Sequence, residues 1–397
     1  MITCGQDKDR EQQREIEHGL PRVGSHVFSF KKRMEAAYMN NKQYKSPLHE
    51  MASTTRTSFW NDSCSIPELT YALEYGAVGA TTNPVIVKEV LQREMDSYKG
   101  RIEELIRERP TATEDDIAWA LNEEMAVAGA KLLEPVFHAS KGQKGRISIQ
   151  TNTKHFKNTE LLVGQALRFH KLGPNMQIKI PATKAGIRAY EEATYHGVSI
   201  NATVCFTVSQ SLAVAEAVER GFKRRAAEGL DSSMMHPVCT IMVGRVDDWL
   251  KAVVDRDGII LDPACLDWAG VAVMKNAYRI YQEKGYRTQL LAAAYRNHHH
   301  WSEFIGGDVS LTIPHMWIKR FNASSITVEH RIDRPVDPKI IAQLSTHLPE
   351  FNKAFRPDGL SLEAFETYGA TCRTLLQFLG GYDELVGIIR KIMIVVR

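Results

Sequence analysis

Short apolar or β-branched runs alternate with longer amphipathic stretches from Arg56 onward. Eight of the short runs have the length and composition of buried strands. They are 58–62 (SFWND), 77–82 (AVGATT), 146–150 (RISIQ), 176–180 (MQIKI), 199–206 (SINATVCF), 239–243 (CTIMV), 289–294 (QLLAAA) and 309–313 (VSLTI). Helix-like stretches lie between them at 113–133, 159–172, 186–196, 208–228, 246–254, 268–284 and 301–305. This alternation predicts a series of parallel βα units.

The stretch 208–228 (VSQSLAVAEAVERGFKRRAAE) illustrates the helical pattern. Its apolar positions recur at the spacing of one helix face: Leu212, Ala215, Val218 and Phe222. Thr207 and Ser209 stand where a hydroxyl can cap the first turn. The sequence therefore predicts an amphipathic helix that begins near residue 208.

Eight βα units over roughly 250 residues fit a (β/α)8 barrel. A doubly wound open sheet is the main alternative, but no glycine-rich fingerprint follows any of the strands. The pattern divides the chain into a weakly ordered extension (1–55), the barrel (56–330) and C-terminal helices (331–397). The amphipathic stretch 362–389 is expected to pack on one mouth of the barrel as a lid.

Composition narrows the class of protein. The 397 residues carry a net charge of +3, with 44% hydrophobic and 24% charged residues, as in ordinary globular proteins. The near-balanced charge gives no reason to expect nucleic acid, and no apolar run is long enough to span a membrane. The N-terminal residues are charged where a signal peptide is apolar, and the six cysteines show no disulfide or metal spacing. A cytoplasmic protein is expected, and a homo-oligomer is compatible with the sequence.

Polar side chains gather where the predicted strands end. Because active sites of (β/α)8 enzymes lie at the carboxyl ends of the strands, these residues are the candidates. They are Asp62, Asn83, Gln150, Lys179, Asn201, Thr203, Thr240, Arg245 and Arg296. Each strand except the eighth supplies at least one polar group near its end.

Most of these residues also have a structural interpretation. Asp62 is suited to an N-cap, and Asn83 followed by Pro84 is a common turn pair. Arg245 is followed by two aspartates and suits a surface ion pair, while Thr203 suits a strand as a β-branched residue. The histidine run 298–300 suggests a metal, but adjacent side chains point in different directions, so no metal site is expected.

Lys179 is harder to explain structurally, because it interrupts the apolar run Met176–Ile180 and lysine is rarely fully buried. Burial disfavours the ammonium form, and a neutral amine attacks carbonyl carbon to form a Schiff base. The alternatives are an ion pair with Asp62 or a side chain that extends to the rim. In a barrel strand, Ile178 and Ile180 would face the helices and Lys179 the interior.

Five blocks in one order resemble the transaldolases, which are Schiff-base enzymes of the class I aldolase superfamily with a (β/α)8 barrel. The blocks are GATTNPVIVKEV (79–90), QIKIPATKAGIRA (177–189), VSINATVCFTVSQSLA (198–213), MVGRVDDW (242–249) and AAAYRN (292–297). The resemblance covers about residues 56–397 and leaves the N-terminal extension out.

The resemblance implies a role for each candidate. Lys179 matches the Schiff-base lysine, and Asp62 matches the carboxylate that moves protons during carbon–carbon cleavage. Asn83 and Asn201 match amides that bind hydroxyls of the dihydroxyacetone unit, Thr203 matches the hydroxyl that helps to hold the catalytic water, and Thr240 stands where a serine contacts the donor. Arg245 and Arg296 match the pair that binds the sugar phosphate. Neither a cofactor nor a metal is implied.

Three positions depart from the transaldolase pattern. Gln150 replaces a glutamate that assists proton transfer through a water, as in the related fructose 6-phosphate aldolases. Met242 matches neither the phenylalanine of transaldolases nor the tyrosine of those aldolases, and Ala294 replaces a serine of the phosphate site.

The expected activity is transfer of a dihydroxyacetone unit between sugar phosphates, as in the pentose phosphate pathway. The alternatives are an aldolase acting on fructose 6-phosphate or another ketose phosphate or sulfonate, and a non-catalytic sugar-phosphate-binding barrel.

Overall fold

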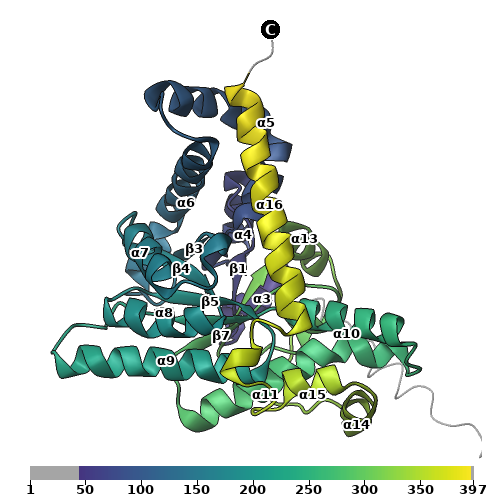
Figure 1. Ribbon diagram of the computed structural model, residues 1–397. Helices are drawn as coiled ribbons and strands as arrows, with labels where there is room; N and C mark the ends of the chain where they lie inside the picture. Colours follow the sequence, from purple (N-terminus) through teal and green to yellow (C-terminus); the bar gives the residue numbers. More distant parts are fainter. Residues whose placement is uncertain (1–43, 395–397) are drawn as a thin grey trace, which may run out of the picture. The chain divides into compact units, whose positions relative to one another are not determined.

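A closed parallel barrel forms the centre of the molecule (Figure 1). The computed structural model describes residues 44–394, and the account below concerns the unit that begins at Pro47. The strands are β1 (Ser58–Asn61), β2 (Gly79–Thr81), β3 (Arg146–Gln150), β4 (Met176–Pro181), β5 (Ile200–Cys205), β6 (Val238–Ile241), β7 (Gln289–Ala292) and β8 (Val309–Ile313). Each pairs with the next in sequence, and β8 pairs with β1. The predicted (β/α)8 fold is confirmed, and the open doubly wound sheet is excluded.

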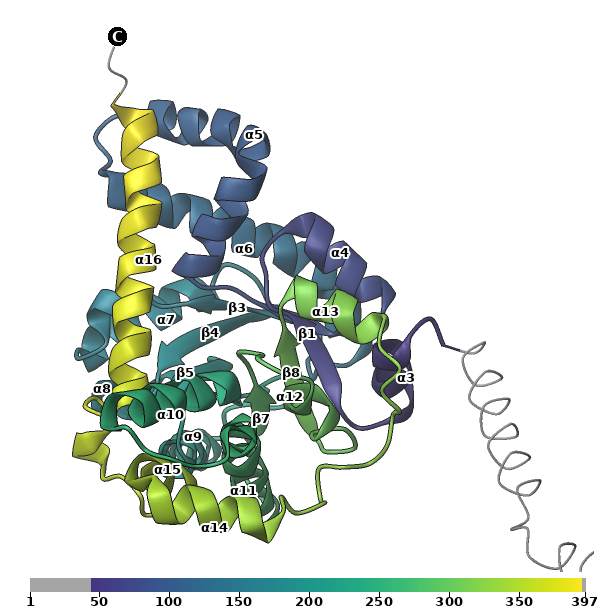
Figure 2. The ribbon, with the colours of Figure 1, turned by 90° about the vertical axis from the view of Figure 1, so that its right-hand side faces the viewer.

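Helices surround the barrel and connect its strands (Figure 2). They are α3 (Pro47–Thr54), α4 (Ile66–Glu74), α5 (Pro84–Glu108), α6 (Glu114–Ala139), α7 (Thr159–His170), α8 (Lys184–Tyr195), α9 (Val208–Ala227), α10 (Val243–Asp257), α11 (Ala269–Lys284), α12 (His299–Ser302) and α13 (His315–Asn322). Six of the seven stretches that the pattern predicted as helical are helices, with ends shifted by up to six residues, whereas in 301–305 only Trp301 and Ser302 are helical. In α9, the Thr207 side chain caps the first turn by accepting a hydrogen bond from Gln210 N, as expected.

The N-terminal extension predicted over residues 1–55 lies mostly outside the described residues. Its last part, Pro47–Thr54, forms α3, whose Leu48 and Met51 side chains are fully buried in the main hydrophobic core. Met51 Sδ accepts a hydrogen bond from the Trp301 indole. Residues 47–54 therefore belong to the packed structure.

Alternation along the strands separates the barrel interior from the helix layer. In β4, Ile178 and Ile180 are fully buried members of the core that the strands share with the helices. A separate apolar cluster joins Trp60, Val238 and Leu291, from β1, β6 and β7. Because β1 and β6 are not neighbours in the sheet, this cluster fills the interior. Glycine at position 79 leaves room for the Trp60 ring in this cluster, since a Cβ on Gly79 would lie 2.6 Å from the ring.

The C-terminal residues form α14 (Pro338–His347), α15 (Pro349–Phe355), the short 3-10 helix η3 (Leu362–Ala364) and the long α16 (Gly369–Met393). The predicted stretch 362–389 is thus two helices. In both views the yellow α16 runs beside α5 and α6 (Figures 1 and 2). Val87, Leu121 and Leu385 belong to the second hydrophobic cluster, which these three helices share. The first turns of α16 lie beside α10, which follows β6.

Candidate active site

Lys179 lies inside the barrel on β4, with only 4% of its surface exposed. Its strand neighbours at the same level are Gln150 on β3 and Asn201 on β5. Burial lowers the pKa of the amine below the ordinary lysine value. The nearby Arg245 guanidinium lowers this pKa further, whereas the Asp62 carboxylate raises it. The predicted interior position of Lys179 is therefore confirmed, and the amine has the environment of a nucleophile.

Asp62 directly follows β1 and is partly exposed. Burial of its carboxyl raises the pKa, and this effect outweighs the opposing effects of Lys179 and of hydrogen bonds from Thr81 and Thr312. The Thr81 hydroxyl donates to Asp62 Oδ1, and it lies 2.6 Å from the Thr312 hydroxyl. A carboxyl with a raised pKa is suited to exchanging protons. The structural alternative, an N-cap, is wrong for this residue, because Ser65 caps α4.

Thr312 corrects one expectation, since the eighth strand was predicted to supply no polar group. Its hydroxyl is buried and reaches Asp62 from β8, while Thr81 reaches it from β2. These two strands flank β1, so the three side chains meet above one part of the barrel. The signal in the sequence was the even spacing of Ser310 and Thr312 in VSLTI, which places both on the interior face.

Asn201 and Thr240 are joined across β5 and β6. The Thr240 hydroxyl donates to Asn201 Oδ1 at 2.6 Å, and Asn201 Nδ2 donates to the Ser148 hydroxyl at 2.9 Å. All three side chains are buried. These two hydrogen bonds fix the orientation of the Asn201 amide, with its Nδ2 end toward β3. The second Nδ2 hydrogen is left for another acceptor.

Thr203 owes its position to an irregularity in β5. The register between β5 and β6 shifts between Ala202 and Cys205, and Val204 has a φ of +53°. This conformation is strained for a β-branched residue and is typical of functional sites. The Thr203 hydroxyl is buried without a hydrogen-bond partner among the described residues. A buried hydroxyl in this state is suited to holding a water or a substrate oxygen.

Gln150 and Asn83 are both buried near the carboxyl ends of their strands. Gln150 Nε2 donates to the Thr153 hydroxyl at 3.1 Å, and its Oε1 has no partner within residues 44–394. Asn83 caps α5, because its Oδ1 accepts a hydrogen bond from Ile86 N at 3.0 Å. Asn83 thus has a structural role, but as a helix cap and not in a turn, and its Nδ2 group is the part left for a ligand.

Arg245 and Arg296, which the resemblance implies bind the sugar phosphate, line one cavity of about 400 Å³. Arg296 binds Asp248 through both sides of its guanidinium, at 2.9 and 2.6 Å. Arg245 donates to Gln377, and its buried Nε has no partner in the described part of the chain. Burial and the charge of Arg296 lower the pKa of Arg245. An added anion would relieve this repulsion.

The first turns of α16 form the other wall of this cavity. Ala370, Arg373, Thr374 and Gln377 contribute to the lining. Three arginines and one aspartate, Asp248, give the lining a formal charge of +3 − 1 = +2, which matches a phosphate dianion. Sequence analysis missed these residues. The signal was their i, i+3, i+4, i+7 spacing, which places them on one face of the predicted helix.

Two of the three positions that depart from the transaldolase pattern, Met242 and Ala294, lie close in sequence to the two arginines of this cavity. Met242 is the residue before α10, is 7% exposed and makes no side-chain cap. Ala294 follows β7 with a φ of +67°. Its carbonyl oxygen lies so close to α10 that a Cβ on Gly244 would be 1.8 Å away. Glycine at 244 therefore allows the segments that carry the two arginines to approach each other.

The histidine run does not form a metal site. His300 is buried against Asp247, and His299 packs on the Trp268 ring at 4.2 Å. No group of three or more His, Cys, Asp or Glu side chains able to hold a metal is found within residues 44–394. Nor does any helix in this range have the length and apolar character needed to cross a membrane.

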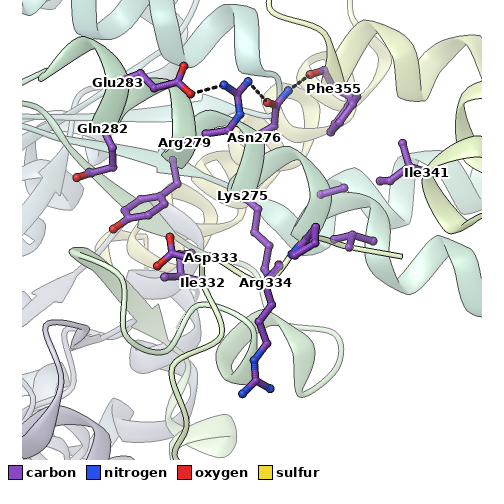
Figure 3. Close-up of a pocket in the computed structure, with 14 residues that line it drawn as sticks. Lys275, Asn276, Arg279, Gln282, Glu283, Ile332, Asp333, Arg334, Ile341 and Phe355 are labelled. Carbon is purple, nitrogen blue, oxygen red and sulfur yellow. Dashed lines mark hydrogen bonds and ion pairs between the residues drawn. The ribbon is translucent and has the colours of Figure 1, made fainter. Parts of the chain in front are cut away.

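A second cavity, of about 420 Å³, lies outside the barrel (Figure 3). It lies between α11 and the segment 332–336. Some of its polar groups are paired with one another: Arg279 binds Glu283 and Asn276, and Asn276 Nδ2 donates to Phe355 O (Figure 3). None of the predicted site residues lines it.

The fold and the site define a (β/α)8 barrel with an interior lysine, a nearby carboxyl and an arginine-lined cavity at one mouth. The chain belongs to the transaldolase/fructose-6-phosphate aldolase family, whose model matches residues 59–358. It is 35% identical to transaldolase 2 of Streptomyces avermitilis over 207 residues, which is 52% of this chain and 55% of the relative. Transaldolase of Mycobacterium ulcerans is 34% identical over 208 residues, with the same coverage. The match to transaldolase 1 of S. avermitilis is 30% identical over 257 residues, 62% of this chain and 67% of the relative. The chain thus spans little more than half the length of the first two relatives.

Proposed function

We propose that the chain is a transaldolase that moves a dihydroxyacetone unit between sugar phosphates through a Schiff base on Lys179. The observation that carries this proposal is a nearly fully buried lysine whose pKa is lowered by burial, with a carboxyl of raised pKa nearby. We propose the reactions of the non-oxidative pentose phosphate pathway, in the cytoplasm, as its setting.

The reaction proceeds in steps that the described residues can serve. The Lys179 amine adds to the ketose carbonyl, water leaves, and the resulting iminium accepts the electron pair of the carbon–carbon bond that breaks. Asp62 takes the proton of the hydroxyl that becomes the departing aldehyde, and returns a proton when an acceptor aldehyde adds. Gln150 and Thr203 would hold the water used in forming and hydrolysing the iminium.

The remaining residues bind the sugar. Asn83, Asn201 and Thr240 would contact the hydroxyls of the dihydroxyacetone unit. Arg245 and Arg296 would bind the phosphate, since planar guanidinium groups donate paired hydrogen bonds to its oxygens. We further propose that residues 331–397 act as a lid through α16, whose first turns line the same cavity.

Borohydride trapping tests this proposal. Fructose 6-phosphate with borohydride should add the mass of a reduced three-carbon or sugar unit at Lys179, located by peptide mapping. A Lys179→Ala protein that retains the adduct would contradict the assignment. Absence of any adduct in the wild-type protein, together with stabilisation by fructose 6-phosphate, would instead support a sugar-phosphate-binding barrel.

Gln150 favours a second candidate, an aldolase that releases free dihydroxyacetone. Its amide can position a water but cannot act as a general base, so transfer steps that need one would slow. Assays of fructose 6-phosphate with and without erythrose 4-phosphate separate the two activities. Free dihydroxyacetone as the main product in both assays would favour the aldolase. Gln150→Glu should move the product ratio toward transfer, and an unchanged ratio would remove the argument from this residue.

A further inference from the structure

A buried pair of titratable side chains, which the proposed reaction does not use, lies behind the anion site. His300 Nε2 is 2.9 Å from Asp247 Oδ2, and both side chains are completely buried. Asp247 belongs to α10 and follows Arg245 by two residues. His300 belongs to α12 and is the last residue of the histidine run. The pair therefore connects the two segments that carry the phosphate-binding arginines.

The aspartate end of the pair holds α11. Asp247 Oδ1 accepts a hydrogen bond from Gly270 N at 2.8 Å, in the first turn of α11, which has no cap from its own N-cap residue. A Cβ on Gly270 would lie 2.2 Å from Val243 O, so the starts of α10 and α11 are in close contact. Asp247 thus supplies the missing cap from a neighbouring helix.

The histidine end holds the segment after β7. His300 Nδ1 accepts a hydrogen bond from the backbone N–H of Arg296 at 3.1 Å. This contact assigns the tautomer: Nδ1 must be without a proton, so Nε2 carries it and donates to Asp247. Three hydrogen bonds in series therefore join Gly270 N, Asp247, His300 and Arg296 N.

We propose that Asp247 and His300 are positioning residues of the anion site, which fix the backbone of Arg296 relative to Arg245. The inference rests on the proposed function in taking phosphate as the ligand of these arginines. Two guanidinium groups bind one phosphate well only at a fixed separation, and an error of about 1 Å in such a position can cost up to about a hundredfold in rate. Neither residue touches the substrate.

Two substitutions of His300 separate the two ends of the pair. In His300→Asn, the side-chain oxygen occupies the place of Nδ1 and can still accept from Arg296 N, whereas the contact with Asp247 is lost. In His300→Gln, the side-chain amide occupies the place of Nε2 and can still donate to Asp247, whereas the contact with Arg296 is lost. The inference predicts a larger loss of phosphate binding in His300→Gln and a larger loss of thermal stability in His300→Asn.

Asp247→Asn provides a second test that changes one atom. If its oxygen continues to accept from Gly270 N, its NH2 group faces His300 Nε2 and forces the ring proton onto Nδ1. That proton then opposes the Arg296 N–H. We expect KM for fructose 6-phosphate to rise about tenfold in Asp247→Asn and His300→Gln, with kcat changed much less. His298→Gln, at the exposed end of the same run, is the matched control.

Calorimetric titration with inorganic phosphate keeps this test independent of catalysis. Weaker phosphate binding in His300→Gln and Asp247→Asn than in His300→Asn and His298→Gln supports the inference, even if the wild-type protein forms no borohydride adduct. Equal phosphate binding in all four variants overturns it, and so does an equal loss in both His300 variants. His300→Gln and Asp247→Asn both break the contact with the Arg296 backbone. If one of these two variants does not fold, phosphate binding by the other decides the outcome.

Discussion

Two cations are buried within this barrel on neighbouring strands, and they are held in opposite ways. Arg146, at the start of β3, is 3% exposed, and its guanidinium donates to two backbone carbonyls, Gly142 O at 3.1 Å and Met234 O. It also lies 4.9 Å from the centre of the Phe137 ring. Lys179, on β4, is 4% exposed, and its amine lies near two opposite charges, the Asp62 carboxylate and the Arg245 guanidinium. Burial lowers the pKa of both, that of Arg146 to about 10.

The difference between Arg146 and Lys179 indicates that buried charge stabilises the fold at one end of the barrel and favours a reactive amine toward the other. An arginine remains charged when buried, so its donors must be matched by acceptors, as they are at the amino ends of the strands. A lysine can instead lose its proton, and leaving its donors unmatched favours the neutral amine. At the carboxyl ends, the unpartnered atoms of Gln150 and Thr203 add to this pattern. Polar atoms without hydrogen-bond partners at the carboxyl ends of the strands are available to bind a substrate.

The largest expected effect comes from Lys179→Met, which replaces the amine with an uncharged side chain of similar length. Turnover should fall by at least about 10⁴-fold, because the covalent intermediate cannot form. The unfolding midpoint should stay the same or rise, because a buried amine is removed. Activity assays and thermal unfolding of the same preparation check both. Lys184→Met, at an exposed ion pair with Glu363, is the control. A marked loss of stability in Lys179→Met would show that its amine is a structural group after all.

Arg146→Met should produce the opposite result. The buried Gly142 carbonyl and the partly buried Met234 carbonyl would lose their donor, so the free energy of unfolding should fall by about 2 kcal/mol. The folded fraction should retain the wild-type rate of borohydride adduct formation, because Arg146 lies at the other end of the strands. Urea unfolding and adduct formation per folded molecule are the measurements. Loss of adduct formation in fully folded Arg146→Met would remove the distinction between the two ends.

The contrast also shows what the sequence could predict. Strand periodicity predicted the closed barrel and the interior position of Lys179, since both follow from local alternation. The same alternation places Arg146 in RISIQ and Lys179 in MQIKI without distinguishing them, because their surroundings include residues distant in sequence. Met234, whose carbonyl accepts from Arg146 across 88 positions, is one example, and Asp62, which acts on Lys179, is another.

Other features depend on tertiary contacts and were missed for that reason. Arg373 reaches the anion cavity only because α16 packs on α5 and α6, and no local pattern reports this. Asp62 meets Thr312 only because β8 closes on β1. The bulge at Val204 arises from a register shift that a strand pattern does not reveal. Local periodicity therefore predicted the elements, while closure and helix packing determined the neighbours.

A smaller effect is expected from Arg373→Ala, which tests how far the pattern of unmatched groups extends onto α16. Arg373 is exposed and contributes charge to the cavity that Arg245 and Arg296 also line. Its removal should weaken phosphate binding about threefold, as for an exposed charge pair, and should leave the unfolding midpoint unchanged. Titration with inorganic phosphate measures this, with Lys391→Ala near the far end of α16 as the control. Equal binding by both variants would place Arg373 outside the anion site.

The smallest effect is a displacement along the pH axis. The rate of adduct formation with dihydroxyacetone and cyanoborohydride should rise with pH as Lys179 loses its proton, through a pKa below the ordinary lysine value. Asp62 raises this pKa, so Asp62→Asn should move the rise to lower pH; Arg245 lowers it, so Arg245→Met should move the rise to higher pH. Because the pKa of Lys179 is depressed in the folded state, its contribution to stability is largest at high pH. That contribution diminishes as the pH falls through the folded-state pKa. Asp257→Asn, on the surface, is the control and should leave the pH profile of adduct formation unchanged. If Asp62→Asn and Arg245→Met displaced the profile in the same direction, the electrostatic explanation of the Lys179 pKa would be contradicted.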